Sequence, residues 1–248
     1  MDFLQSIDTE LLLAINGWHN AFLDHWLWNI TQRYTWIALY VAMLSVIVIS
    51  RKRSVLSPQQ SAVSNQRSAV SQPRSGCTLI ADNRKHIFNI IAIVVAIAAC
   101  AGLADYLSSG VIKHAVERLR PTQNPELEGM LHIVNGYRGG MYGFVSSHAA
   151  NTFSVALLFS LLIRDRLTTL TLMLWVALNC YSRVYLGVHY PGDILGGLLL
   201  GAAVALIIYA ILNRTGIAKK EDSSIEKPRY CKYIIPVVFV LTCVVTMF

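Results

Sequence analysis

The sequence predicts an all-α polytopic membrane protein: a six-transmembrane-helix bundle with an N-terminal amphipathic, interfacial helical region. Two observations support this prediction. Of the 248 residues, 54% are hydrophobic and only 14% are charged, whereas a soluble domain carries about 25% charged residues. The apolar residues also gather in six long runs that polar segments separate. The length suits a single compact domain over residues 1–248.

The first helical region, residues 1–32, is amphipathic rather than uniformly apolar. Side chains such as Phe3, Ile7 and Leu11 recur at helical spacing with polar residues between them, and three tryptophans follow. This pattern is typical of helices that lie in the membrane interface. A surface helix that packs on the bundle is the alternative.

Six apolar runs follow, each near the length that a membrane crossing requires. A spanning helix needs about 20 mainly apolar residues. The predicted spans are Tyr34–Ser50, His86–Ser109, Ser147–Ile163, Leu167–Arg183, Gly192–Leu212 and Tyr233–Phe248. The last run is short, so a buried or re-entrant segment is the alternative there.

The charged segments between the runs predict the orientation. Residues 51–85 are polar and low in complexity, which favours a flexible linker, and 213–232 form a second charged connection. Most of the 21 Lys and Arg residues lie in these two segments or at Arg164 and Arg166. The positive-inside rule puts them in the cytoplasm. The lipid bilayer is therefore the expected partner, and nucleic acid is not. The predicted location is the bacterial cytoplasmic (inner) membrane.

Several reactive side chains emerge together on the opposite, periplasmic side. Each lies where an apolar run ends or the next one begins. They are Lys113, Arg120, His148, Arg183, His189 and Asp193. Three cations, two imidazoles and a carboxylate on one membrane face predict a site that binds a phosphate group and acts on it.

Lys113 and Arg120 form the first candidate pair. They are seven residues apart, so a continuing helix would place both on one face before Pro121 stops it. Arg offers a planar fork of donors to phosphate oxygens, and Lys adds a point charge. The alternative is an interfacial pair that extends toward lipid headgroups.

The second candidate segment, Val145–His148, precedes a helix rich in small residues. Ser146 and Ser147 can cap that helix, and a helix N-terminus binds phosphate through its free backbone N–H groups. His148 is then suited to transfer a proton. A simple serine cap beside an interfacial histidine is the alternative.

The third segment, Ser182–Asp193, is the strongest local signal. Asp193 lies one helical turn after His189, so its carboxylate can hold one imidazole nitrogen and orient the other for attack. Arg183 supplies a further phosphate contact. A His–Asp cap with an interfacial arginine is the alternative. Asp105, inside an apolar run, is a functional candidate or a charge partner of Lys113.

Together these segments resemble the three-part signature of the type 2 phosphatidic acid phosphatase superfamily. The first part is Lys, six residues, then Arg-Pro, and Lys113–Pro121 matches it. The third part is Ser-Arg, five residues, His, three residues and Asp, and Ser182–Asp193 matches it in full. The middle part is usually Pro-Ser-Gly-His, whereas Val145–His148 read Val-Ser-Ser-His. The resemblance covers roughly residues 105–200.

The resemblance implies a phosphatase that needs neither a metal nor another cofactor. His189 would attack phosphorus and form a phosphohistidine, and Asp193 would orient it. His148 would protonate the leaving oxygen and then assist hydrolysis of the intermediate. The residues that would bind the phosphoryl oxygens are Lys113, Arg120, Arg183, Ser146 and Ser147.

The expected substrate is a membrane lipid phosphate, with undecaprenyl diphosphate as the first choice. Lipid A phosphates, phosphatidylglycerol phosphate and phosphatidic acid are the alternatives within the family. Outside it, buried cations and histidines also mark transporters, although here they cluster at one end of the helices. A serine hydrolase that uses Ser146 or Ser147, and a metal enzyme that uses His148, His189 and Asp193, are further alternatives.

Overall fold

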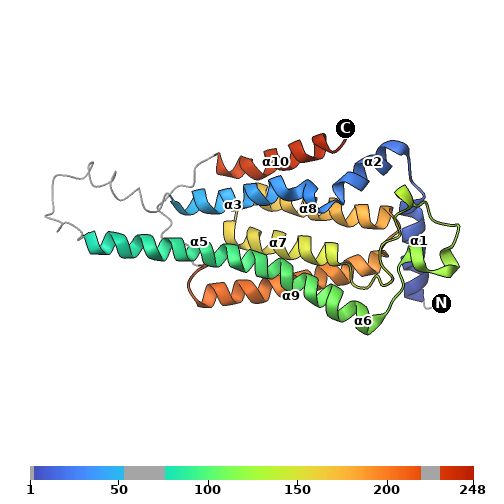
Figure 1. Cartoon of the computed structure of the whole chain (residues 1–248), viewed down its shortest axis with the longest axis horizontal. Helices are drawn as coiled ribbons and strands as arrows, with labels where there is room; N and C mark the ends of the chain where they lie inside the picture. Colours follow the sequence, from blue (N-terminus) through green and yellow to red (C-terminus); the bar gives the residue numbers. More distant parts are fainter. Residues whose placement is uncertain (1–2, 53–75, 219–229) are drawn as a thin grey trace.

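The computed structural model describes residues 3–52, 76–218 and 230–248, and Figure 1 shows their arrangement as a bundle of helices. Within these ranges the chain forms helices and loops, with one isolated bridge between Leu119 and Tyr142. The α-helices are α1 (Phe3–Asn16), α2 (Ala21–Ile30), α3 (Ile37–Lys52), α5 (Gly76–Asp105), α6 (Lys113–Val116), α7 (Ser147–Ile163), α8 (Arg166–Tyr185), α9 (Pro191–Arg214) and α10 (Cys231–Val245). The prediction of an all-α protein is confirmed for the part of the chain that is described.

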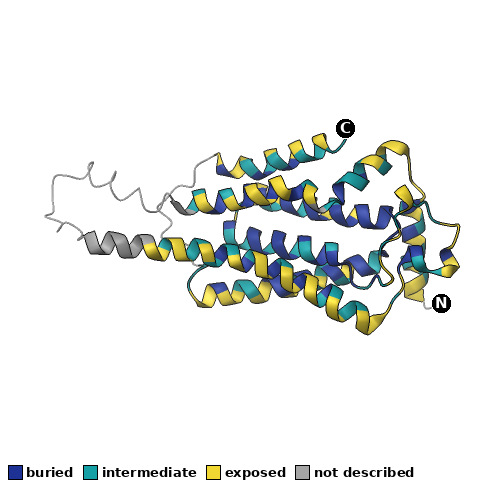
Figure 2. Cartoon of the chain, viewed as in Figure 1, coloured by how far each residue is buried: buried dark blue, intermediate teal, exposed yellow. Residues whose placement is uncertain are grey.

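The long helices run side by side, and α7 lies at the centre of the bundle (Figure 1). It packs most extensively against α9 and also contacts α5 and α8. Two glycines of α9 allow the close approach. A Cβ at Gly197 would lie 2.5 Å from the carbonyl oxygen of Ser146, and one at Gly201 would lie 2.6 Å from that of Ala150. Figure 2 shows that buried residues gather on α7 and α8, whereas exposed residues face outward.

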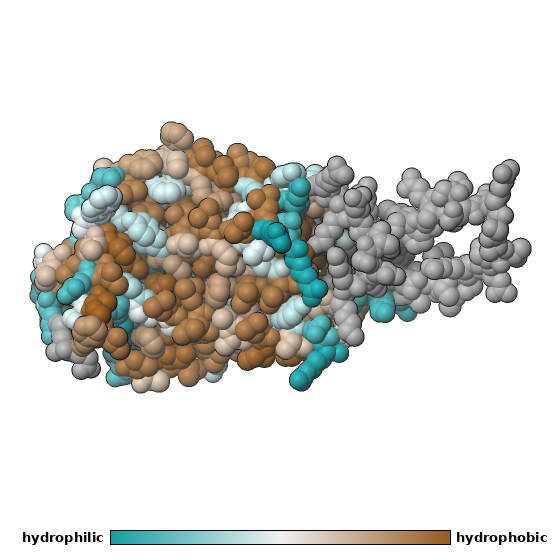
Figure 3. Space-filling model, turned by 180° about the vertical axis from the view of Figure 1, so that it is seen from behind, coloured by the Kyte–Doolittle hydropathy of each residue, from teal (hydrophilic) through white to brown (hydrophobic). Residues whose placement is uncertain are grey.

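Among the described residues, two helices are long and apolar enough to cross a membrane, namely Arg84–Val116 and Pro191–Arg214. Ala21–Ile30 and Tyr34–Ser50 would supply a third span if the pair, bent by 70°, crosses as one. Ser147–Ile163 and Cys231–Val245 are shorter apolar helices. Figure 3 shows hydrophobic residues covering the middle of one face of the bundle, with hydrophilic residues toward its ends. The described part of the chain therefore has the apolar helices and the apolar surface of a membrane-embedded protein.

The N-terminal helices close one end of the bundle. α1 runs across this end rather than along the bundle, and it contacts α8 and α9 (Figure 1). Leu12 and Asn16 are buried on its inner side, while Phe3 and Leu4 are exposed. This arrangement fits both the interfacial helix and the packed surface helix that the sequence left open.

One boundary differs from the sequence prediction. The linker was predicted over residues 51–85, but α3 continues to Lys52 and α5 begins at Gly76. The stretch 76–85 is therefore helical, because it continues directly into the long apolar run that follows and carries no proline to stop a helix. The centre of the predicted linker lies outside the described residues.

Candidate active site

The predicted reactive side chains meet at the end of the bundle that α1 covers. The last turns of α5 and α8 and the first turns of α7 and α9 lie there, as the alternating direction of the helices requires. A cavity of about 570 Å³ opens between them. The predicted residues that line it are Lys113, Arg120, Ser147, His148, Arg183 and His189. Ser146 and Asp193 are fully buried and lie outside the cavity lining.

The path from Lys113 to Arg120 differs from the single helix that the spacing predicted. The α-helix widens into a π-helical segment over Tyr106–Ile112 and then ends at Val116, where Glu117 adopts a left-handed conformation with φ of 53°. The chain continues extended, so Lys113 and Arg120 do not share a helical face. They reach the same cavity because the extended segment turns back, where the Arg120 N–H donates to the carbonyl of Met141 at 3.0 Å.

Arg120 is buried, and its guanidinium lies beside His189. Its Nη1 lies 3.2 Å from His189 Nε2 and donates to the carbonyl oxygen of Val188 at 3.2 Å, while its Nε donates to that of Tyr142 at 3.1 Å. A Cβ at position 139 would lie 2.9 Å from Arg120 Nη1, so this site requires Gly139. The arginine is therefore fixed before any phosphate binds.

His189 has both ring nitrogens engaged. Its Nδ1 lies 3.3 Å from Asp193 Oδ2, and its Nε2 faces the Arg120 guanidinium. Because arginine only donates hydrogen bonds, these partners assign the proton to Nδ1 and a lone pair to Nε2. Burial lowers the pKa of His189 well below its ordinary value of 6.5, and the charges of Arg120, Arg183 and Lys113 lower it further. The neutral imidazole, with an unprotonated Nε2 beside Arg120, is the form that a nucleophile needs.

Asp193 is held by three donors besides orienting His189 through Nδ1. The backbone N–H of Tyr190 donates to Oδ2 at 3.1 Å, which forms part of the N-terminal cap of α9. Arg118 Nη1 donates to Oδ1 at 2.9 Å, and the Asp193 carbonyl accepts the N–H of Ser146 at 2.9 Å. These contacts position the carboxylate and join the start of α7 to the start of α9.

Arg118 was not identified as a site residue from the sequence. The expected helix would have turned Arg118 away from Arg120. In an extended chain, residues two apart lie on the same side, and both arginines reach the start of α9. Arg118 could therefore have been predicted from its position two residues before Arg120, if the segment before Pro121 had been taken as extended.

The two serines differ from their predicted capping role. Ser146 occupies the N-cap position of α7, but its side chain makes no capping hydrogen bond, and its buried Oγ has no partner among the described residues. Ser147 lines the cavity, where its Oγ accepts a hydrogen bond from Lys113 Nζ at 2.7 Å and lies 2.7 Å from Ser109 Oγ. The Ser147 hydroxyl is therefore engaged by Lys113 and Ser109. The structure thus brings Ser147, rather than Ser146, to the cavity wall.

Arg183 emerges from the last turn of α8 and is almost fully buried. Its Nη1 donates to Thr31 Oγ1 at 2.8 Å and its Nη2 to the Tyr137 hydroxyl at 3.3 Å. Its Nε has no partner among the described residues. Tyr137 comes from the loop between α6 and α7, so this loop contributes to the cavity. Neither Thr31 nor Tyr137 belongs to one of the three motif segments, and both reach Arg183 through tertiary contact.

The rest of the cavity lining combines polar and aromatic side chains. Asn151 Nδ2 donates to Asp105 Oδ1 at 3.1 Å, and both residues line the cavity. Trp36, Tyr40 and Trp175 line it as well, and the two rings of Trp36 and Tyr40 pack edge-on against Trp175. No group of three or more His, Cys, Asp or Glu residues that could hold a metal ion occurs among the residues with described positions.

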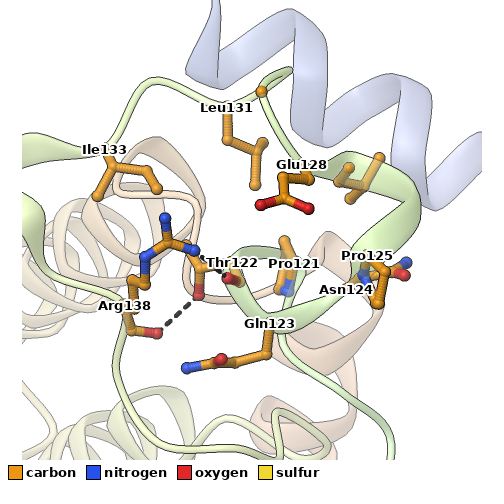
Figure 4. Close-up of a pocket in the computed structure, with 11 residues that line it drawn as sticks. Pro121, Thr122, Gln123, Asn124, Pro125, Glu128, Leu131, Ile133 and Arg138 are labelled. Carbon is orange, nitrogen blue, oxygen red and sulfur yellow. Dashed lines mark hydrogen bonds between the residues drawn. The ribbon is translucent and has the colours of Figure 1, made fainter.

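A smaller cavity of about 170 Å³ lies within the loop between α6 and α7 (Figure 4). Two hydrogen bonds close the loop around it. Thr122 Oγ1 donates to the carbonyl oxygen of Arg138 at 2.6 Å, and Arg138 Nη1 donates to that of Thr122 at 3.1 Å. The loop is thus tied to itself directly after Arg120, which helps to fix that residue.

A helical membrane protein with a cationic, histidine-lined cavity fits the class that the comparisons show, a lipid phosphatase. The family model of the PAP2 superfamily matches residues 87–217, and the chain belongs to this family of type 2 phosphatidic acid phosphatases. No solved structure matches the chain.

Three relatives indicate the range of the family around this chain. The lipid A 4'-phosphatase of Bacteroides thetaiotaomicron is 31% identical over 91% of this chain and 85% of its own length. The lipid A 4'-phosphatase of Porphyromonas gingivalis is 29% identical over 85% of this chain and 75% of its own. The decaprenylphosphoryl-5-phosphoribose phosphatase of Mycobacterium tuberculosis is 33% identical over 49% of this chain and 70% of its own.

Proposed function

We propose that this lipid phosphatase hydrolyses its substrate through a phosphohistidine at His189, without a metal. The observation that carries the proposal is the arrangement of that side chain: Nδ1 faces the Asp193 carboxylate, and Nε2 faces Arg120, which lines the same cavity as His189. A neutral imidazole held in this way is a nucleophile beside a site for anions. In phosphoryl transfer the protein contributes mainly position and charge.

The proposed reaction has two steps. In the first, His189 Nε2 attacks phosphorus, the bond from phosphorus to the lipid oxygen breaks, and His148 donates a proton to that oxygen. In the second, His148 takes a proton from water as the water oxygen attacks phosphorus. The phosphorus–nitrogen bond then breaks and releases inorganic phosphate. His148 is suited to both roles because it lines the same cavity from the first turn of α7.

The phosphoryl oxygens would be bound by the cations that line the cavity and by the start of α7. Lys113, Arg120 and Arg183 supply the positive charge, and the first backbone N–H groups of α7 add their dipoles. When a phosphate oxygen accepts the hydrogen bond of Lys113 Nζ in place of Ser147 Oγ, the Ser147 hydroxyl can donate a hydrogen bond to the phosphate. Ser146 contributes by fixing the start of α7 to Asp193.

The substrate that fits best is lipid A bearing a 4'-phosphate. Two relatives that align with most of this chain carry that name. Lipid A presents a phosphorylated sugar, whose hydroxyl and amide groups can donate hydrogen bonds. Asp105 in the cavity lining supplies an acceptor for such groups, and the aromatic residues that line the same cavity suit an apolar chain. In undecaprenyl diphosphate, the first choice from the sequence, the diphosphate joins hydrocarbon directly and offers no such donors.

The proposed setting is the bacterial cytoplasmic membrane, with the site on its periplasmic side. Six helices, α3, α5, α7, α8, α9 and α10, would cross the bilayer, and α1 would lie in the outer interface. The asymmetry of Lys and Arg between the two sides supports this orientation. The cavity would then lie near the headgroups, where lipid phosphates are concentrated.

The test is phosphate release by purified, detergent-solubilised protein in the presence of a chelator. Lipid A, undecaprenyl diphosphate, phosphatidylglycerol phosphate and phosphatidic acid form the panel, and mass spectrometry locates the phosphate lost from lipid A. His189→Ala is compared with His25→Ala, which removes an exposed histidine of α2. We expect release by wild type and His25→Ala, but not by His189→Ala.

Other outcomes have distinct meanings. Loss of activity with chelator would contradict the metal-independent mechanism. A preference for undecaprenyl diphosphate would overturn the substrate proposal but not the phosphatase. A denatured enzyme quenched during turnover should carry an acid-labile phosphate, and a phosphate that is stable to acid would point to serine instead.

A further inference from the structure

The first helix reaches the catalytic end of α9 through one carboxylate. Asp8, on the inner side of α1, accepts the backbone N–H of Gly192 on Oδ1 at 2.6 Å. Its Oδ2 accepts Arg118 Nη2 at 2.6 Å. Gly192 precedes Asp193 directly, so Asp8 caps the helix that carries the orienting carboxylate.

Arg118 bridges the two carboxylates. Its Nη2 contacts Asp8, and its Nη1 contacts Asp193 Oδ1 at 2.9 Å. Its guanidinium also lies 4.1 Å from the centre of the Tyr190 ring. Oδ2 of Asp193 is left for the Tyr190 N–H and His189 Nδ1. The two oxygens therefore have separate tasks, and Arg118 prevents the carboxylate from rotating away from the histidine.

The space at Gly192 indicates that the approach of Asp8 is built into the fold. A Cβ at this position would lie 2.7 Å from Asp8 Oδ2 and 3.2 Å from its Cγ. Any larger residue would displace the Asp8 carboxylate from the start of α9. The contact thus depends on a glycine as well as on the two charged side chains.

The geometry points to Asp8 and Arg118 as positioning residues for His189, which makes α1 part of the catalytic apparatus. This inference rests on the proposed function, in which His189 is the nucleophile. Asp8 holds Arg118, Arg118 holds the Asp193 carboxylate, and Asp193 holds the proton on His189 Nδ1. Neither Asp8 nor Arg118 lines the cavity, so neither contacts the substrate phosphate there.

This chain of contacts predicts an effect on turnover rather than on substrate binding. In metal sites, replacing a residue that orients a ligand through a hydrogen bond typically costs about 10- to 100-fold in activity, and an effect of similar size is expected for residues that orient His189. We expect Asp8→Asn and Arg118→Gln to lower kcat by about tenfold or more, with KM within about twofold of wild type because the phosphate-binding cations stay in place. Gly192→Ala should have the same effect as Asp8→Asn. Glu10→Gln, on the exposed side of α1, is the matched control.

The decisive experiment repeats these substitutions in an Asp193→Asn background. Single-turnover phosphate release from lipid A measures the rate, and thermal unfolding shows which variants are folded. If Asp8 and Arg118 act through Asp193, their replacement should cause little further loss in that background. Equal losses in both backgrounds would show a merely structural role and overturn the inference, as would wild-type kcat in Asp8→Asn. If Arg118→Gln does not fold, Arg118→Lys and Asp8→Asn decide the outcome.

Failure of the proposed function would look different. In that case wild type would release no phosphate, or His189→Ala would remain active. The inference fails alone if wild type is active, His189→Ala is inactive and Asp8→Asn is as fast as Glu10→Gln.

Discussion

Replacing Asp193 by asparagine separates the charge of this side chain from its shape. The carboxylate is fully buried, and its two oxygens receive the Tyr190 N–H, Arg118 Nη1 and His189 Nδ1. An amide has one acceptor oxygen and one donor group. If the NH₂ group takes the place of Oδ2, His189 must move its proton to Nε2, which then cannot attack. If it takes the place of Oδ1, it faces the Arg118 cation.

The size of the loss follows from this conflict. In a Ser-His-Asp triad, the same exchange lowers kcat about 10⁴-fold because the histidine adopts the wrong tautomer. The His189–Asp193 contact of 3.3 Å is longer than an optimal hydrogen bond. We therefore expect a decrease of about 10²- to 10⁴-fold, which corresponds to about 2.7 to 5.4 kcal/mol in the activation free energy.

The assay is kcat at saturating lipid phosphate, with thermal unfolding measured on the same preparations. Asp165→Asn serves as the control because Asp165 caps α8 at the opposite end of the bundle through the Thr168 N–H, and asparagine caps equally well. A folded Asp193→Asn protein that retains kcat within tenfold of wild type would refute the orienting role.

Three further predictions concern the pH dependence, the packing and the substrate. The pKa of His189 is lower in the folded than in the unfolded state, so the unfolded state binds the extra proton first as pH falls below about 6.5. The stability of the wild-type protein should therefore decrease as pH falls through that range. Thermal unfolding should show a smaller decrease for His189→Asn. Gly197→Ala places a Cβ 2.5 Å from the Ser146 carbonyl oxygen, so it should destabilise the fold by about 1–3 kcal/mol. Gly102→Ala is the control, because its Cβ meets no neighbour within 4 Å and should leave the stability unchanged. Asp105→Ala should raise kcat/KM for undecaprenyl diphosphate relative to lipid A, and an unchanged ratio would exclude Asp105 from substrate selection.

The sequence was sufficient to predict the helical membrane fold and the family. Composition and the six apolar runs fixed the fold class, because a bilayer allows few other structures. The motif spacings also predicted which residues meet, since His189 and Asp193 lie one turn apart and the helices alternate in direction. The number of spans and their orientation stay predictions. In the described part of the chain, two helices are long and apolar enough to cross a membrane, or three if the bent pair counts as one span.

Local conformation was harder to predict. The spacing of Lys113 and Arg120 fits two turns of helix, yet the chain leaves the helix at Glu117. Val116, Glu117 and Leu119 offer no glycine or proline that would signal this end. The break is enforced from elsewhere, where the extended segment pairs with Met141 and ties itself through Thr122. Contacts between distant segments override local preference here.

Four cations lie near His189, namely Lys113, Arg118, Arg120 and Arg183, and their partners differ in a way that the sequence does not show. Arg120 and Arg183 face the cavity, and neither forms an ion pair with a carboxylate among the described residues, so their charge is available to a phosphate. Arg118 lies between Asp8 and Asp193, and the two carboxylates offset its charge. The sequence places Asp8 in a surface helix, 110 residues before Arg118. Only the fold brings the acid to that arginine. In the proposed mechanism the cations therefore have separate tasks: some bind the anion, and one orients the group that attacks it.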